Sequence, residues 1–361
     1  MTDITRDDIR AAVGAGMMSE AQAASLLSLA DTRRGVRSHM SGLDEPFELF
    51  RGFNEIFIVV GMAILYMGWA GLTGLSILAL EQGYSRALGF SVIGMIASVL
   101  LARYFTLTRR MVAPSIALVI FFALNAVQFS VALAAAFDVE FGGIFITIGL
   151  VGTALLCGYY LWFRVPFAAA LIAIGVFVTL FSLLGNLDQN QQDISDLFLL
   201  TADGPFALVT ILVGIATFAV AMRFDMSDPH RLTRRSATGF WLHVIAAPAI
   251  VNTVALSLLD IDTFATQMLL IAFIGFIALM AIVIDRRSFL VSGVGYIVAL
   301  SITLMEGQAF TVILILGMGL ITLGAKWEAI RGSIMRRLPD FKGKDFLPPW
   351  AAIETPQEIS S

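Results

Sequence analysis

Ten apolar stretches, each about 20 residues long, follow one another along the chain from residue 55 onward. A helix needs about 20 apolar residues to cross a bilayer, and helices satisfy their own backbone polar groups in lipid. The charged fraction of 14% is far below the value of about 25% that is usual for soluble domains. We therefore predict an all-α membrane protein, a bundle of about ten transmembrane helices. The expected spans are residues 55–79, 86–105, 112–136, 142–163, 166–185, 205–223, 239–259, 263–284, 288–305 and 307–325.

Basic and acidic residues are sorted onto opposite sides of this bundle. Arg86 is the only one of the 23 basic residues on one side, which instead carries acidic residues. These are Glu81, Asp138, Glu140, Asp188, Asp193, Asp196, Asp203, Asp260, Asp262 and Glu306. Short loops rich in Lys and Arg stay in the cytoplasm, so both termini are expected there. Only three of the 23 basic residues are lysines, a bias toward arginine that is typical of GC-rich bacterial genomes. We therefore expect a bacterial host and its inner membrane.

The segments outside the spans divide into three. Residues 1–35 are predicted to form a cytoplasmic helical hairpin, since two capping-box patterns open helical periods there. Residues 36–53 form a linker with aromatic residues suited to the membrane interface, residues 54–326 the bundle, and residues 327–361 a cytoplasmic helix and tail. The hairpin is either a docking surface for a cytosolic protein or a simple amphipathic cover for membrane-proximal surface.

Landmarks repeat along the bundle. Asp138 and Arg164 recur as Asp260 and Arg286, both 122 residues later, and the tetrapeptide LTRR at 107–110 recurs at 232–235. Spans two to five thus match spans six to nine. Four spans per unit would give parallel repeats, although apolar helices that end in arginine also align by chance.

Two sequence stretches carry a resemblance. GAGMMSEAQAASLL at 14–27, followed by a linker and many spans, resembles bacterial inner-membrane proteins grouped as families of unknown function, and FWLHVIAAPAIVN at 240–252 is similar to segments of such proteins. The resemblance implies a hairpin followed by a multi-span bundle and assigns no activity, cofactor or catalytic residue.

Polar residues inside spans are costly and therefore mark candidate sites. In the seventh span, His243 lies about 9 Å to the cytoplasmic side of the centre, Pro248 frees a backbone carbonyl, and Asn252 follows one turn later. In the third span, Asn125 and Gln128 share a face. These five residues either line a polar path or form hydrogen bonds between helices.

The connection after the sixth span is the second candidate. Arg231, Arg234 and Arg235 either contact an anionic headgroup or phosphate, or belong to a charge-balanced loop. The acidic loop at 186–204 fits no metal-binding pattern. We expect no catalytic residue, metal, cofactor or nucleic-acid partner; the lipid bilayer is the expected partner, and a homo-oligomer is compatible with the sequence.

Two functional classes follow. The first is a permease or exporter for a small or lipid-like solute, suggested by the repeat and the broken seventh span. The second is a non-transporting scaffold or sensor whose hairpin docks a cytosolic partner. An enzyme ranks third, because no nucleophile and base stand together. No acidic residue lies near a span centre, so coupling through a buried carboxylate is not expected.

Overall fold

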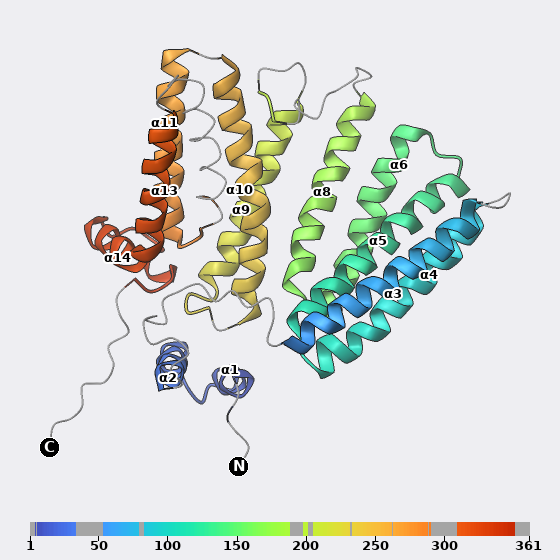
Figure 1. Ribbon diagram of the computed structural model, residues 1–361, viewed down its shortest axis with the longest axis horizontal. Coiled ribbons are helices and arrows are strands. Elements are labelled where there is room, and N and C mark those ends of the chain that lie inside the picture. Colours follow the sequence, from blue (N-terminus) through green and yellow to red (C-terminus); the bar gives the residue numbers. More distant parts are fainter. Residues whose placement is uncertain are drawn as a thin grey trace. The chain divides into compact units, whose positions relative to one another are not determined.

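The regular elements of the described chain are all helices in this computed structural model (Figure 1). The structure describes residues 4, 6–33, 53–78, 83–187, 198–200, 205–231, 233–261, 263–287, 289 and 309–350. Within these ranges eight helical segments are long and apolar enough to cross a membrane. They are Phe53–Gly74, Gly83–Thr108, Val112–Ala136, Phe141–Phe163, Pro166–Gly185, Phe206–Met226, Arg234–Ile261 and Phe264–Ile284.

These segments confirm the first eight predicted spans and the multi-pass membrane class. The ninth predicted span, 288–305, lies outside the described residues apart from residue 289. The tenth, 307–325, overlaps helix α13 (Ala309–Ala325), which is apolar but only 17 residues long. The count of ten therefore stays a prediction.

The chain divides into two compact units. Unit 1 comprises Met1–Pro46, Phe218–His243 and Ala255–Ser361, and unit 2 comprises Phe47–Thr217 and Val244–Val254. Helices α9 (Phe206–Met226) and α10 (Arg234–Ile261) contribute residues to both.

Unit 2 is a group of long helices with a mostly apolar core (Figure 1). Its core residues include Leu118, Phe122, Tyr159 and Phe163, with Phe122 stacked at a tilt on Tyr159. The helices are α3 (Phe53–Leu78), α4 (Gly83–Ala102), α5 (Val112–Ala136), α6 (Phe141–Thr147), α7 (Thr153–Phe163) and α8 (Pro166–Leu187). Two π-helical segments, η1 (Arg103–Thr108) and η2 (Ile148–Gly152), continue α4 and join α6 to α7.

Glycines bring the helices of unit 2 into close contact. A Cβ on Gly94 would lie 2.1 Å from Asn125 Oδ1, and one on Gly175 would lie 2.1 Å from Thr153 Oγ1. Helices in lipid gain little from the hydrophobic effect, so small residues that allow close packing drive their association. Unit 2 therefore packs polar side chains directly against the backbones of neighbouring helices.

Unit 1 contains α11 (Phe264–Ile284), α13, α14 (Trp327–Arg337) and the short η4 (Lys344–Phe346), together with parts of α9 and α10. The long helices run side by side, and α14 lies across one end of them (Figure 1). Pro248 lies within α10, which continues through it as a helix.

The N-terminal helices α1 (Arg6–Gly14) and α2 (Glu20–Arg33) belong to unit 1. They bury Ile9 and Ala23 against each other. Of the two predicted capping boxes, Thr5 with Asp8 involves a residue outside the described chain. Ser19 with Gln22 forms the second, because the Ser19 amide donates to Gln22 Oε1 at 2.9 Å and its hydroxyl accepts from the Gln22 amide at 3.3 Å.

Candidate functional site

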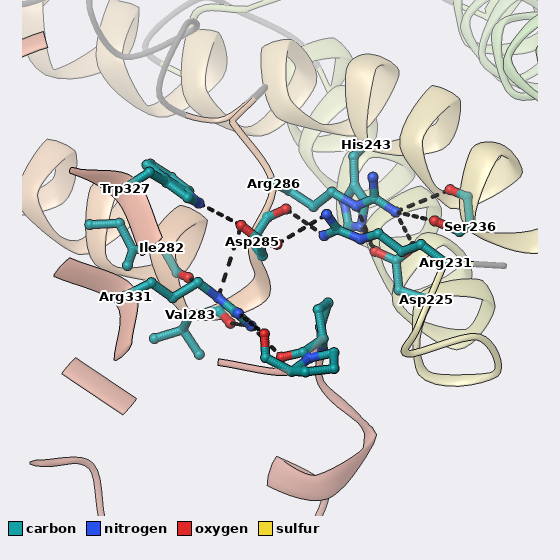
Figure 2. Close-up of polar contacts among 12 residues, drawn as sticks. Asp225, Arg231, Ser236, His243, Ile282, Val283, Asp285, Arg286, Trp327 and Arg331 are labelled. Carbon is teal, nitrogen blue, oxygen red and sulfur yellow. Dashed lines mark hydrogen bonds and ion pairs between the residues drawn. The ribbon is translucent and has the colours of Figure 1, made fainter. Parts of the chain in front are cut away.

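A buried group of charged side chains occupies the end of unit 1 where α9 and α11 end and α10 and α14 begin (Figure 2). We call it the Asp225–Asp285 cluster. Its members are Asp225, Arg231, Ser236, His243, Asp285, Arg286, Trp327 and Arg331. Charges are expensive to remove from water unless they are paired, so the pairing in this cluster determines whether the helix ends can pack.

Asp225, in the last turn of α9, is the centre of the first half. Arg286 binds it with both arms of the guanidinium: Nη2 lies 2.6 Å from Oδ1 and Nε lies 2.9 Å from Oδ2. His243 Nε2 of α10 lies 2.9 Å from the same Oδ2. Arg286 Nη2 also donates to the Ser236 carbonyl at 3.0 Å. One carboxylate thus joins α9, α10 and Arg286, which lies two residues beyond the end of α11.

The packing around Asp225 leaves little spare volume. A Cβ on Gly239 of α10 would lie 2.1 Å from Asp225 Oδ1, so only glycine admits the carboxylate there. The His243 ring is fully buried and lies edge-on to Phe218 and Phe289, with centroid separations of 5.4 and 5.8 Å. These aromatic walls exclude water, which strengthens each charge-assisted hydrogen bond.

Asp285 is the centre of the second half. It ends α11 in the left-handed conformation, with φ of 58°. Arg231 reaches it twice, with Nη1 3.0 Å from Oδ2 and Nη2 2.8 Å from the Asp285 carbonyl. The Trp327 indole donates to Oδ1. Asp228 accepts from the Thr233 amide and hydroxyl, at 2.8 and 2.7 Å, and so orders the turn that carries Arg231.

Arg331 of α14 fastens the last turn of α11. Its Nε donates to the Ile282 carbonyl at 3.1 Å, and the same carbonyl accepts from the Asp285 amide at 3.3 Å, so Arg331 adds a second bond where the helix ends. Burial lowers the pKa of the Arg331 guanidinium, Asp285 opposes that shift, and Arg231 adds to it. Arginine remains charged despite such shifts, so Arg331 acts here as a permanent cation.

The cluster is suited to fixing helices in place. Its carboxylates are each surrounded by cationic or neutral donors, and its members are largely shielded from solvent. Among the described residues no group of three or more His, Cys, Asp or Glu side chains could hold a metal ion. The arrangement can hold four helix ends in register, and it offers no exposed nucleophile.

Only some of the candidate site residues that were predicted from the sequence lie in the Asp225–Asp285 cluster. His243 and Arg231 lie inside the cluster, whereas Arg234 and Arg235 are exposed at the start of α10. Pro248 and Asn252 belong to unit 2 and His243 to unit 1.

In unit 2, Asn125 lies at the middle of its span with 1% of its surface exposed. Its Nδ2 donates to the Phe121 carbonyl at 2.7 Å. Gln128, one turn later, is half-buried. The two residues that were predicted to share a face therefore differ in exposure.

Sequence reasoning missed Asp225, Asp285 and Arg286 as interacting residues. Asp225 and Arg286 are 61 positions apart, so no local pattern joins them. A usable signal existed, because Asp225 and Asp285 are acidic residues at span ends that are otherwise flanked by arginines. Such an exception to charge sorting indicates a buried ion pair.

Comparisons with protein-family models, with curated proteins and with solved structures found no match to this chain. The description that stands is therefore a polytopic helical membrane protein with eight candidate spans.

The Asp225–Arg286 pair should behave as one energetic unit. Asp225→Asn alone leaves the Arg286 cation buried without its carboxylate, and Arg286→Gln alone leaves the Asp225 carboxylate buried without that cation. We expect either change to lower the free energy of unfolding by about 3–5 kcal/mol. The double variant should lose much less than the two single losses combined. Thermal unfolding of the purified protein in detergent measures this, with exposed Arg235→Gln as the control. Additive losses, or single losses as small as that of the control, would show that the pair contributes little.

Proposed function

We propose that the protein is a permease or exporter for a small, uncharged or lipid-like solute. The observation that supports this most directly is η2, a π-helical segment at the middle of the span Phe141–Phe163. π-Helical turns inside α-helices are rare and are frequently found at functional sites. Transporters also build their solute sites at the midplane from interrupted helices.

Polar atoms without partners lie at the same depth in unit 2. Asn125 and Thr153 are each at the middle of their spans. Within the described part of the chain, Asn125 Oδ1 and Thr153 Oγ1 are buried and form no hydrogen bond. A buried polar atom without a partner costs free energy, and a solute that supplied the missing hydrogen bond would recover it.

The facing glycines give these polar atoms a way to become accessible. Asn125 packs against Gly94 and Thr153 against Gly175, and both glycines lie at the middle of their own spans. A small separation of α4 from α5, or of α7 from α8, would uncover a carbonyl oxygen or a hydroxyl. Because neither an acidic nor a basic residue lies near these positions in the sequence, we propose an uncharged solute whose movement is not coupled to a buried carboxylate.

The proposed topology is ten spans in a bacterial inner membrane with both termini in the cytoplasm. Trp327, just after α13, donates to Asp285, just after α11, so both helices end at the same side of unit 1. The ten-span prediction likewise ends its eighth and tenth spans on one side, so the arrangement of these two helices supports it.

Backbone geometry supports the proposed duplication. Arg110 and Arg164 have positive φ angles of 54° and 49°, and Arg231 and Asp285, each 121 residues later, have 55° and 58°. Non-glycine residues seldom adopt this conformation. This offset is one residue shorter than the 122 that relates Asp138 and Arg164 to Asp260 and Arg286, and Asp138, with φ of 50°, has no such counterpart, so the angles support parallel repeats only at these two positions.

A scaffold or sensor is the second candidate, and the hairpin favours it. Helices α1 and α2 bury their own small core, yet Leu26 and Leu29 are 42% and 49% exposed outside the spans. Glu20 of α2 lies 3.6 Å from His230, in the connection after α9. In this alternative the exposed leucines contact a cytosolic protein and the spans only anchor the hairpin.

Transport can be tested with a matched pair of hydroxyl deletions. Thr153→Val and Thr179→Val each remove a hydroxyl that packs against a glycine, but the Thr179 hydroxyl already donates to the Gly175 carbonyl at 2.8 Å. We expect vesicles containing the protein to pass one or more solutes of a panel of urea, glycerol, polyols and short-chain lipids faster than protein-free vesicles. Thr153→Val should slow that flux about tenfold or more, as expected for a lost solute hydrogen bond of about 1.5 kcal/mol. Equal flux in both variants would contradict a role for Thr153.

Topology can be tested by cysteine labelling in intact cells. In a Cys157→Ser background, Glu140→Cys should react with an impermeant thiol reagent and Arg235→Cys should react only after the cells are opened, because basic connections face the cytoplasm. Both positions are exposed, so the reagent can reach them. Labelling of Arg235→Cys in intact cells would overturn the proposed orientation.

The hairpin separates the two functional candidates. If it is a docking element, deleting residues 1–35 should leave membrane insertion and thermal stability unchanged. In the full-length protein, the double change Leu26→Ser with Leu29→Ser should abolish a photo-crosslink between position 22 and a cytosolic protein. The change Ala11→Ser, at an exposed position on α1, is the control. A fall in stability on deletion would show instead that the hairpin is part of the fold.

A further inference from the structure

The segment that follows α13 in unit 1 is hydrogen-bonded to the end of the span Phe264–Ile284. We call Trp327–Trp350 the C-terminal cap. Arg331 of the cap donates to the carbonyl of Ile282, in the last turn of the span Phe264–Ile284 (Figure 2). Trp327 donates to Asp285, one residue beyond that span. The cap is therefore fixed next to the membrane boundary.

Hydrogen bonds also fold the cap onto itself. Arg331 donates to the carbonyls of Pro348 and Pro349, at 2.6 and 2.7 Å, so the end of the cap returns to α14. Lys344 donates to the Leu338 carbonyl and to Asp340, both at 3.0 Å. The chain can turn between these contacts because Gly343 has a φ of 108°. The surface of the cap is thus presented in a defined arrangement.

That surface combines cations with aromatic rings. Arg336, Arg337 and Lys342 are exposed, and Phe341 and Phe346 are exposed by 44% and 56%. Two acidic residues lie beside them: Asp340, which is offset by its ion pair with Lys344, and the exposed Asp345, so the three cations still outnumber the one carboxylate that is not offset. Large exposed aromatic residues are uncommon on surfaces that face water only, and they favour the headgroup layer of a membrane.

We propose that the C-terminal cap binds the anionic lipid headgroups of the membrane leaflet beside it. The three cations attract lipid phosphates, and the two phenylalanines enter the boundary between headgroups and acyl chains. The cap lies beside the end of α11, where the span Phe264–Ile284 stops, which brings lipid headgroups within its reach. The proposal does not depend on whether the protein transports a solute.

Lipid-dependent stability of the full-length protein tests the proposal. The purified protein in a zwitterionic detergent is titrated with phosphatidylglycerol or with phosphatidylcholine, and its unfolding temperature is measured. Phosphatidylglycerol should raise that temperature and phosphatidylcholine should not. Each basic residue near an anionic surface contributes about fivefold to binding, so Arg336→Gln, Arg337→Gln and Lys342→Gln together should raise the half-saturating phosphatidylglycerol concentration on the order of 100-fold. Phe341→Ser with Phe346→Ser should weaken binding by a smaller factor.

A second triple variant separates a local site from general attraction. Arg103→Gln, Arg109→Gln and Arg110→Gln remove the same charge from exposed positions of unit 2. This control should retain phosphatidylglycerol binding, and the cap variant should keep the wild-type unfolding temperature without lipid. Inorganic phosphate at the same concentration should not stabilise the protein. Equal losses in the two triple variants, unchanged binding in the cap variant, or stabilisation by phosphate alone would each overturn the proposal.

Discussion

The bidentate pair between Asp225 and Arg286 is the interaction on which the end of unit 1 depends. Its two residues are 61 positions apart, and the same carboxylate contacts His243, so the pair fixes three helices at once. Removing two charges from water costs several kcal/mol each, and that cost is offset only with good geometry and further hydrogen bonds. The Ser236 carbonyl and the His243 ring supply those bonds. A buried pair is therefore better understood as a device that selects one arrangement of helices than as a large source of stability.

The spans could be predicted because the information that determines them is local. A run of about 20 apolar residues suffices, and the eight described spans begin or end within a few residues of the predicted limits. The cluster could not be predicted in the same way, because pairing between helices depends on which ends meet in space. His243 was identified as a polar residue inside a span, but its partner Asp225 lies at the end of another helix. Pro248 illustrates the opposite limit, since α10 absorbs it without ending.

The helices inside unit 1 and the helices inside unit 2 are held by different interactions. In unit 1, full charges pair at helix ends, near the boundary where side chains leave the hydrocarbon layer. In unit 2, hydroxyls and an amide pack against glycines in the middle of the spans. The first arrangement is strong and directional, because ionised donors and acceptors form the strongest hydrogen bonds. The second arrangement relies on close contact, and separating such helices forfeits many small dispersion terms and no ion pair.

This difference bears on where a solute could be bound. A ligand that entered the charge cluster would have to compete with its ion pairs, because both carboxylates already hold arginine partners. A mid-span polar atom without a partner has more to gain: Asn125 Oδ1 and Thr153 Oγ1 have given up hydration and received no hydrogen bond from the described residues in return. The span of Thr153 also includes η2, where the backbone hydrogen-bond pattern already departs from the α-helix. If the protein moves a solute, the physical argument therefore favours the middle of unit 2 as the binding region, and assigns the charged end of unit 1 the task of holding its helices fixed.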